Sequence, residues 1–248
     1  MPTLTWVGKD KVVNHHHDVP FRILNKQYNF TANNNSPINS TQNRIIQGDN
    51  LEALKSLLPE FEGKVKCIYI DPPYNTGNEG WVYNDNVNDP KMKKWLGQVV
   101  GKEGEDLSRH DKWLCMMYPR LKLLHKLLAD DGVIFISIDD MEQATLKLIM
   151  DEIFGLSNFV TNVIWHKKYS VANDHKSIAP VHDFLLVYSK SSNWIRKLLP
   201  RKESNDKQYN KLDEKGVWRA DNYKCNKTAD ERPNLYYAIT NPNTGEVI

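Results

Sequence analysis

The chain has 248 residues, a formal net charge of +2 at pH 7, 40% hydrophobic residues and 26% charged residues. This length is sufficient for one or two domains with a buried core, and the composition is typical of a soluble protein. The nearly neutral charge excludes a uniformly basic nucleic-acid-binding protein, so any such affinity must come from a local patch. No apolar run reaches the length of a membrane span, and the amino terminus has no signal-peptide pattern.

Residues 1–43 are polar and have few periodic apolar positions, which predicts an extended lead-in. The adjacent histidines in His15–Asp18 do not predict a metal site, because neighbouring imidazoles cannot all face one ion and no partner spacing supports it. The three cysteines are widely spaced along the chain, which predicts reduced thiols in a cytoplasmic protein.

The next segment predicts a strand and then a helix. Arg44–Gln47 contains two adjacent isoleucines and predicts a short strand. Leucines recur at helical spacing between residues 51 and 58, so a helix is expected there. Either Asp49 or Asn50 is expected to cap its amino terminus.

A buried strand is predicted at Val65–Ile70, where β-branched and aromatic residues predominate. Two prolines, Pro72 and Pro73, prevent further strand pairing, because proline has no backbone N–H. Asp71 and Tyr74 are therefore presented together at the carboxyl end of a strand. In open α/β sheets this is the edge at which ligands bind.

This turn has the groups needed to hold an amine on an aromatic ring. Asp71 and a proline carbonyl, that of Pro72, can both accept hydrogen bonds from one amino group, while Tyr74 offers a flat surface for stacking. Two acceptors on the amine favour a tetrahedral nitrogen and free its lone pair for attack. The turn would thus act through preorganised dipoles rather than through a nucleophilic side chain.

Downstream of a long polar stretch, Asn75–Leu107, helices and strands alternate. An amphipathic helix is predicted after a capping-box pattern at 108–111, with a kink or break at Pro119. Strands are expected at 133–138, 159–166 and 184–188, with a further helix at Met141–Phe154. Together with the strand at 65–70, we expect four strands in one sheet, the first three joined by helices.

Basic residues are concentrated between Thr161 and Lys202, where eight Lys or Arg side chains face only two acidic ones. Such a local excess is what phosphate contacts require. The residues expected to contact DNA are Lys167, Lys168, Lys176, Arg196 and Lys197. Apolar residues become sparse in the last part of the chain. We therefore place a domain boundary near residue 190, which separates residues 44–190 from residues 191–248.

The run Lys66–Gly77 resembles the catalytic motif of modification subunits of type III restriction–modification systems. These proteins are circularly permuted, amino-methylating DNA methyltransferases. The resemblance implies an α/β, Rossmann-like, S-adenosylmethionine-dependent fold and adenine-N6 methylation of double-stranded DNA in the bacterial cytoplasm, with a restriction subunit as partner. It implies catalytic roles for Asp71, Pro72, Pro73 and Tyr74, cofactor contacts from Asp49, Asn50 and Asp71, and a base pocket with Tyr74 and Trp165.

One part of the family pattern is missing from the chain. No Gly-x-Gly sequence occurs, although the family holds S-adenosylmethionine with a glycine-rich loop that follows target recognition. We therefore expect an amino-terminal part of a longer protein, with residues 191–248 beginning the target-recognition region. Weak cofactor binding and little activity are expected of this chain alone, and a homodimer is expected of the full-length protein.

Three alternatives remain open at this point. Cytosine-N4 is the nearest other substrate, and the initial Asp of the motif favours adenine by resemblance only. A non-catalytic DNA-recognition module would account for the basic segment and the missing glycine loop. A metal-dependent hydrolase using Asp139, Asp140 and Asp71 with the histidine tract has the least support, because these residues lack a metal-binding spacing.

Overall fold

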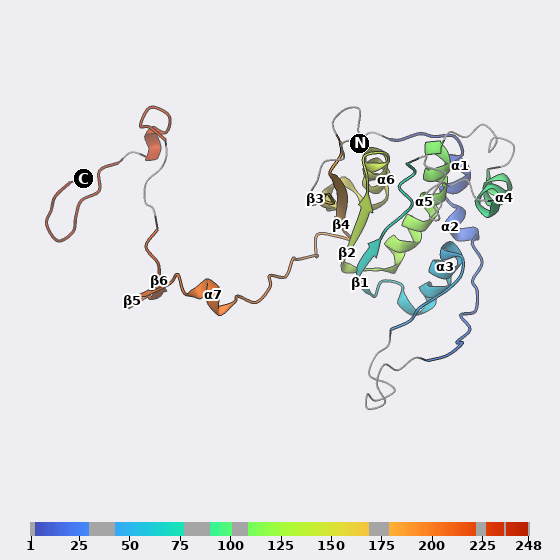
Figure 1. Cartoon of the computed structure of the whole chain (residues 1–248), viewed down its shortest axis with the longest axis horizontal. Helices are drawn as coiled ribbons and strands as arrows, with labels where there is room; N and C mark the ends of the chain where they lie inside the picture. The colour runs from blue at the N-terminus through green and yellow to red at the C-terminus, as the bar shows by residue number, and fades with distance from the viewer. Residues whose placement is uncertain are drawn as a thin grey trace. The chain divides into compact units, whose positions relative to one another are not determined.

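The computed structural model describes residues 3–29, 43–76, 90–100, 109–168, 179–221, 227–235 and 237–247. The chain divides into two compact units, Met1–Arg196 and Lys197–Ile248 (Figure 1). The first unit contains the main sheet, its helices and the Asp-Pro-Pro-Tyr turn. Among the described residues, no helix is both long and apolar enough to cross a membrane.

The main sheet is mixed and has the order β1-β2-β4-β3. Its strands are β1 (Val65–Ile70), β2 (Leu128–Ile138), β3 (Phe159–His166) and β4 (His182–Ser189). β1 and β2 are parallel, whereas β4 runs antiparallel to both of its neighbours, β2 and β3. All four predicted strands are confirmed, and β1 and β2 end at the same edge of the sheet.

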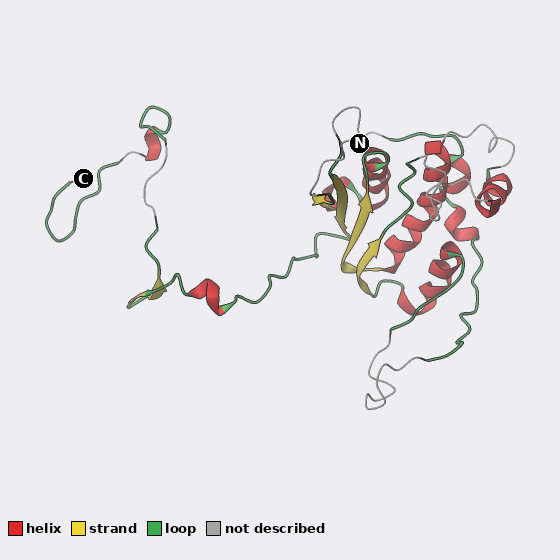
Figure 2. Cartoon of the chain, viewed as in Figure 1, coloured by secondary structure: helices red, strands yellow, loops and turns green. Residues whose placement is uncertain are grey.

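Helices join the first three strands, as expected (Figure 2). α4 (Pro90–Val99) and α5 (Arg109–Leu127) lie between β1 and β2, and α6 (Gln143–Phe154) lies between β2 and β3. α5 is a single helix that includes Pro119, so the helix does not break at this proline, and the expected kink stays a prediction.

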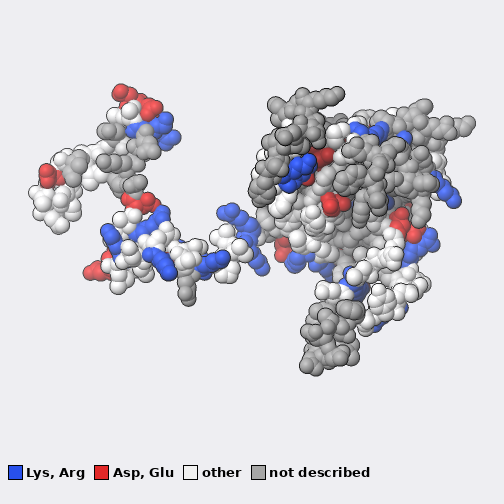
Figure 3. Space-filling view, in the orientation of Figure 1, with Lys and Arg blue, Asp and Glu red and all other residues white. Residues whose placement is uncertain are grey.

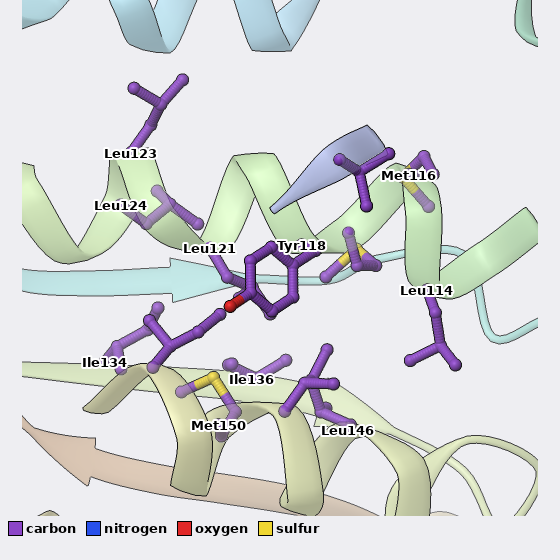
Figure 4. Packing of buried hydrophobic residues seen from close by; sticks show 14 of the residues in the cluster. Leu114, Met116, Tyr118, Leu121, Leu123, Leu124, Ile134, Ile136, Leu146 and Met150 are labelled. Atoms are coloured by element: carbon purple, nitrogen blue, oxygen red, sulfur yellow. The ribbon is translucent and has the colours of Figure 1, made fainter. Parts of the chain in front are cut away.

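The main core lies where α5 and α6 pack against each other and against β2 (Figure 4). The helices contribute Tyr118, Leu121, Leu146 and Met150, and the strand contributes Ile134 and Ile136, all less than 2% exposed. Because apolar burial is the main stabilising contribution to folding, this layer holds α5 and α6 against β2.

The first part of the amino-terminal segment is not extended, in contrast to the prediction, whereas residues 20–29 have no regular secondary structure. It contains two short helices, α1 (Lys9–Val12) and α2 (His15–Asp18), both of which contact α5. Trp6 and Val12 are buried, and the Trp6 indole N–H lies 3.3 Å from Cys115 Sγ. A few well-separated apolar side chains therefore dock the segment onto α5, and periodicity alone does not reveal them.

The predicted strand at Arg44–Gln47 is wrong, because these residues have no regular secondary structure. Ile45 is fully exposed, and no strand among the described residues pairs with this segment. Arg44 instead pairs with Glu60 of α3 (Asn50–Phe61). A β-prone tetrapeptide needs a neighbouring strand to satisfy its backbone, and local propensity cannot supply one.

In the described residues of the second unit, the helices and strands are short. They are α7 (Glu203–Asp206), β5 (Lys211–Asp213), β6 (Gly216–Trp218) and the 3-10 helix η3 (Pro233–Leu235). β5 and β6 form an antiparallel hairpin, and a single bridge joins Thr240 to Val247.

Gly132 allows β1 and β2 to approach closely. A Cβ atom at this position would lie 2.9 Å from the backbone oxygens of Val65 and Ala129. We expect Gly132→Ala to lower the free energy of unfolding by about 1–3 kcal/mol, because rigid backbone atoms would have to move. Urea denaturation of the chain measures this change.

The matched control is Gly97→Ala in α4, where nothing lies within 4 Å of the added methyl group. Alanine favours the helix, so a gain of up to about 1 kcal/mol is expected there. Equal effects of the two substitutions would contradict the close approach at Gly132.

Candidate active site

The Asp-Pro-Pro-Tyr turn (71–74) leaves the carboxyl end of β1, as the sequence predicts. Asp71 is exposed, whereas Tyr74 is half-buried and packs against the core. The turn therefore presents a carboxylate to solvent beside an aromatic ring that the core supports.

Polar groups lie close to the Tyr74 hydroxyl, among them Asp71 and Ser137 of β2. Burial, followed by the negative charge of Asp71, raises the pKa of Tyr74. Ser137 Oγ also lies 2.6 Å from the hydroxyl of Tyr69. Because Tyr74 stays protonated, it presents a neutral hydroxyl beside the Asp71 carboxylate.

The two proline carbonyls of the turn have different surroundings. Trp113 of α5 is fully buried and donates its indole N–H to the carbonyl of Pro73 at 2.6 Å. This bond occupies one acceptor of the turn and attaches it to the longest helix. Of the two carbonyls, the described hydrogen bonds engage that of Pro73 and not that of Pro72.

Asn75, directly after the turn, is fully buried and has a positive φ of 60°. Its side-chain amide donates to Glu142 at 2.5 Å. Sequence reasoning missed Trp113, Ser137 and Glu142, which come from distant parts of the chain. One local signal pointed to Glu142, because a glutamate occupies the position before α6 where Asp, Ser, Thr or Asn is preferred.

Asp49 and Asn50 both have structural partners. Asp49 Oδ1 accepts from the backbone N–H groups of Leu51 at 2.8 Å and Glu52 at 3.3 Å, so the predicted cap of α3 is confirmed. Asn50 Oδ1 accepts from Arg120 Nε at 2.8 Å. Arg120 is buried, and desolvation lowers its pKa to about 10, although the charge of Asp49 opposes this shift. The two residues thus connect α3 to α5.

Trp165 is not brought next to Tyr74. It lies near the end of β3, is 66% exposed and pairs across the sheet with Asp183. Two strands separate β3 from β1, so three spacings of about 4.8 Å lie between the two strands. A role for Trp165 in the base pocket stays a prediction.

The predicted DNA-binding residues are only partly described. Lys167 pairs with Asp183 at 2.5 Å, and Lys168 is exposed. Lys176 lies outside the described residues. Arg196 ends the first unit and Lys197 begins the second, and exposed basic side chains gather along this part of the chain (Figure 3).

No group of three or more His, Cys, Asp or Glu side chains is placed to hold a metal ion within the part of the chain that the structure describes. His16 is buried in α2, and burial together with nearby positive charges lowers its pKa to about 4. This histidine therefore packs as a neutral side chain.

The sheet, the helices that join its strands and the turn at its carboxyl edge define part of an α/β, Rossmann-like methyltransferase domain. The family model described as DNA methylase, N6_N4_Mtase, matches residues 65–244. The chain belongs to this family.

Curated relatives are similar over much of the chain. It is 42% identical over 197 residues to the StyLTI Mod subunit of a type III restriction-modification enzyme from Salmonella typhimurium, covering 73% of this chain and 29% of the relative. It is 41% identical over 170 residues to the EcoP15I Mod subunit of Escherichia coli, covering 65% and 26%. It is 37% identical over 232 residues to the type II methyltransferase M.KpnI of Klebsiella pneumoniae, covering 91% and 52%. The chain thus spans at most about half the length of these relatives.

Proposed function

We propose that the chain is the catalytic part of a DNA adenine-N6 methyltransferase of a restriction–modification system. The observation that carries this proposal is the exposed Asp71 carboxylate at the carboxyl end of β1, in a turn attached to α5 through Trp113. Membership in the N6_N4 DNA methylase family and the similarity to Mod subunits support it.

Two acceptors of the turn would hold the amine of the target base. The Asp71 carboxylate would accept one amine hydrogen and the Pro72 carbonyl the other. The backbone here is restrained by proline, so these acceptors need little reorganisation when the nitrogen becomes tetrahedral. Asp71 need not act as a strong base, since the amine becomes acidic only after it has been methylated.

Tyr74 would stack on a base that has left the DNA duplex. Stacking of a base on an aromatic ring contributes about 1–3 kcal/mol, which offsets part of the cost of extruding it. The packing of the half-buried Tyr74 against the core favours a fixed ring. A fixed ring orients the base relative to Asp71 before reaction.

S-adenosylmethionine would be the cofactor, and when bound it supplies an electrophilic methyl group. Exposed Asp71, and Asp49 at the amino-terminal end of α3, offer carboxylate oxygens that fit its ammonium and hydroxyl groups. Asn50 already accepts from Arg120, so its contribution would be to hold the end of α3 in place.

Double-stranded DNA would be the substrate. Phosphate contacts would come from Lys167, Lys168, Lys176, Arg196 and Lys197, with residues 191–248 beginning the target-recognition region. Because Lys167 pairs with Asp183, a phosphate would have to compete with that carboxylate. A restriction subunit and a second copy of the protein are the proposed partners.

Product analysis tests the proposed reaction. The full-length protein would be incubated with methyl-labelled S-adenosylmethionine and duplex DNA, and the nucleosides would then be identified by mass spectrometry. Labelled N6-methyladenine is the expected product. Labelled N4-methylcytosine would show that the substrate is cytosine rather than adenine. Salt-dependent DNA binding with no labelled nucleoside would favour a non-catalytic recognition module.

A further inference from the structure

Glu142, directly before α6, has a side chain that is completely buried. Its backbone carbonyl accepts the first hydrogen bond of the helix from Leu146, but its carboxylate caps no backbone N–H of α6. Glutamate is not a preferred residue at this position. Helix initiation therefore does not explain why a carboxylate is buried here.

The carboxylate is instead surrounded by hydrogen-bonding side chains. Oε1 lies 2.5 Å from Asn75 Nδ2 and 2.7 Å from His110 Nδ1, and Oε2 lies 2.5 Å from Thr145 Oγ1. Buried carboxylates are costly unless such partners compensate for lost hydration. Thr145 belongs to α6 itself, whereas Asn75 follows the turn and His110 lies in the first turn of α5.

Asn75 is the residue that connects this cluster to the turn. Its φ of 60° is in the left-handed region, which asparagine tolerates better than most side chains. Its amide donates to the carbonyl of Arg109 at 3.3 Å as well as to Glu142. The chain is thus held in an uncommon conformation one residue beyond Tyr74.

The turn therefore has three attachments. The ladder between β1 and β2 holds its start, since Ile70 pairs with Ile136. Trp113 holds its middle through the carbonyl of Pro73. Asn75 and Glu142 hold its end.

We propose that Glu142 is a positioning residue that sets the geometry of the Asp-Pro-Pro-Tyr turn by binding Asn75. This inference rests on the proposed methyltransferase function, and it assigns a role to a residue from another part of the chain. Glu142 acts through Asn75 and does not touch the substrate. His110 and Thr145 hold the carboxylate in the orientation that Asn75 requires.

Two substitutions remove the attachment from opposite sides. Glu142→Leu deletes the acceptor and keeps an apolar group of similar volume in the buried site. Asn75→Gly deletes the donor, and glycine adopts the positive φ without strain. Glu142→Gln keeps one carbonyl oxygen that can accept from Asn75, so it is the conservative variant.

The matched control is Glu152→Gln. Glu152 is a glutamate within α6, and it accepts from Lys9 at 2.6 Å and from Tyr118 at 2.8 Å. None of the contacts that the structure describes for Glu152 reaches the turn, so this variant reports the general effect of neutralising a carboxylate in this region.

All variants would be made in the full-length protein and compared by kinetics and by hydrogen–deuterium exchange of the peptide 68–76. We expect Glu142→Leu and Asn75→Gly to lower kcat by about 100-fold with little change in KM for DNA, because small displacements of reacting groups are costly. Exchange in 68–76 should increase in both. Glu142→Gln should recover most of the activity, and Glu152→Gln should match the wild type.

Hydrogen exchange separates failure of this inference from failure of the proposed function. Faster exchange at 68–76 in a protein that methylates no DNA would support the attachment and reject the methyltransferase reaction. Unchanged exchange and unchanged kcat in both Asn75→Gly and Glu142→Leu would overturn the positioning role. If Glu142→Leu fails to fold, Asn75→Gly and Glu142→Gln still decide the question.

Discussion

Replacing Asp71 with Ala is expected to abolish methyl transfer by the full-length protein while sparing its affinity for DNA. Asp71 is exposed at the carboxyl end of β1 and provides one of the two acceptors proposed for the amine. Removing one preorganised polar group from an active site typically lowers kcat by about 10²–10³-fold.

A methyl-transfer assay with labelled S-adenosylmethionine and a DNA-binding titration would measure the two effects separately. Asp71→Asn should retain more activity than Asp71→Ala, because the amide oxygen can still accept one hydrogen bond. Asp131→Ala is the matched control, since Asp131 is also an exposed carboxylate near an end of the sheet and pairs with Lys66. Full methylation activity of the Asp71→Ala variant would contradict the proposed role of Asp71 in the reaction.

Replacing Trp113 with Ala is expected to be among the most destabilising substitutions in the chain. Trp113 is fully buried between the core and the turn, and it donates to the carbonyl of Pro73. Loss of a large buried aromatic residue costs about 3–5 kcal/mol through lost burial and the cavity that remains. Urea denaturation of the chain, monitored by circular dichroism, measures the change.

Trp113→Phe separates packing from hydrogen bonding. It keeps most of the apolar volume but removes the indole N–H, so the carbonyl of Pro73 loses its partner at a cost of about 1–3 kcal/mol. Trp165→Ala is the control, because Trp165 is 66% exposed and should change stability by no more than about 0.5 kcal/mol. Equal losses for Trp113→Ala and Trp165→Ala would contradict the assigned burial.

Local patterns predicted most of the sheet. The strands at 65–70, 133–138, 159–166 and 184–188 are short apolar runs rich in β-branched and aromatic residues, and each corresponds to one of β1 to β4. The cap of α3 by Asp49 was predictable for the same reason, because capping depends on residues only two or three positions apart.

Predictions failed where a distant partner decides the conformation. Arg44–Gln47 has the residues of a strand but no neighbour to pair with. Residues 9–18 have little periodicity but become helical where Trp6 and Val12 dock on α5. Docking on another element, rather than local propensity, determines the conformation of such segments, because helical turns this short are not stable alone.

The sequence by itself determined the chemistry of the turn, since two prolines, a carboxylate and an aromatic ring in consecutive positions fix which groups the end of β1 presents. Only the tertiary structure decided how that turn is held. Its supports, Trp113, Ser137 and Glu142, lie about 40–70 residues away along the chain and meet the turn because β1 and β2 are parallel neighbours. Long-range strand pairing and helix packing create these contacts, and no local pattern encodes them.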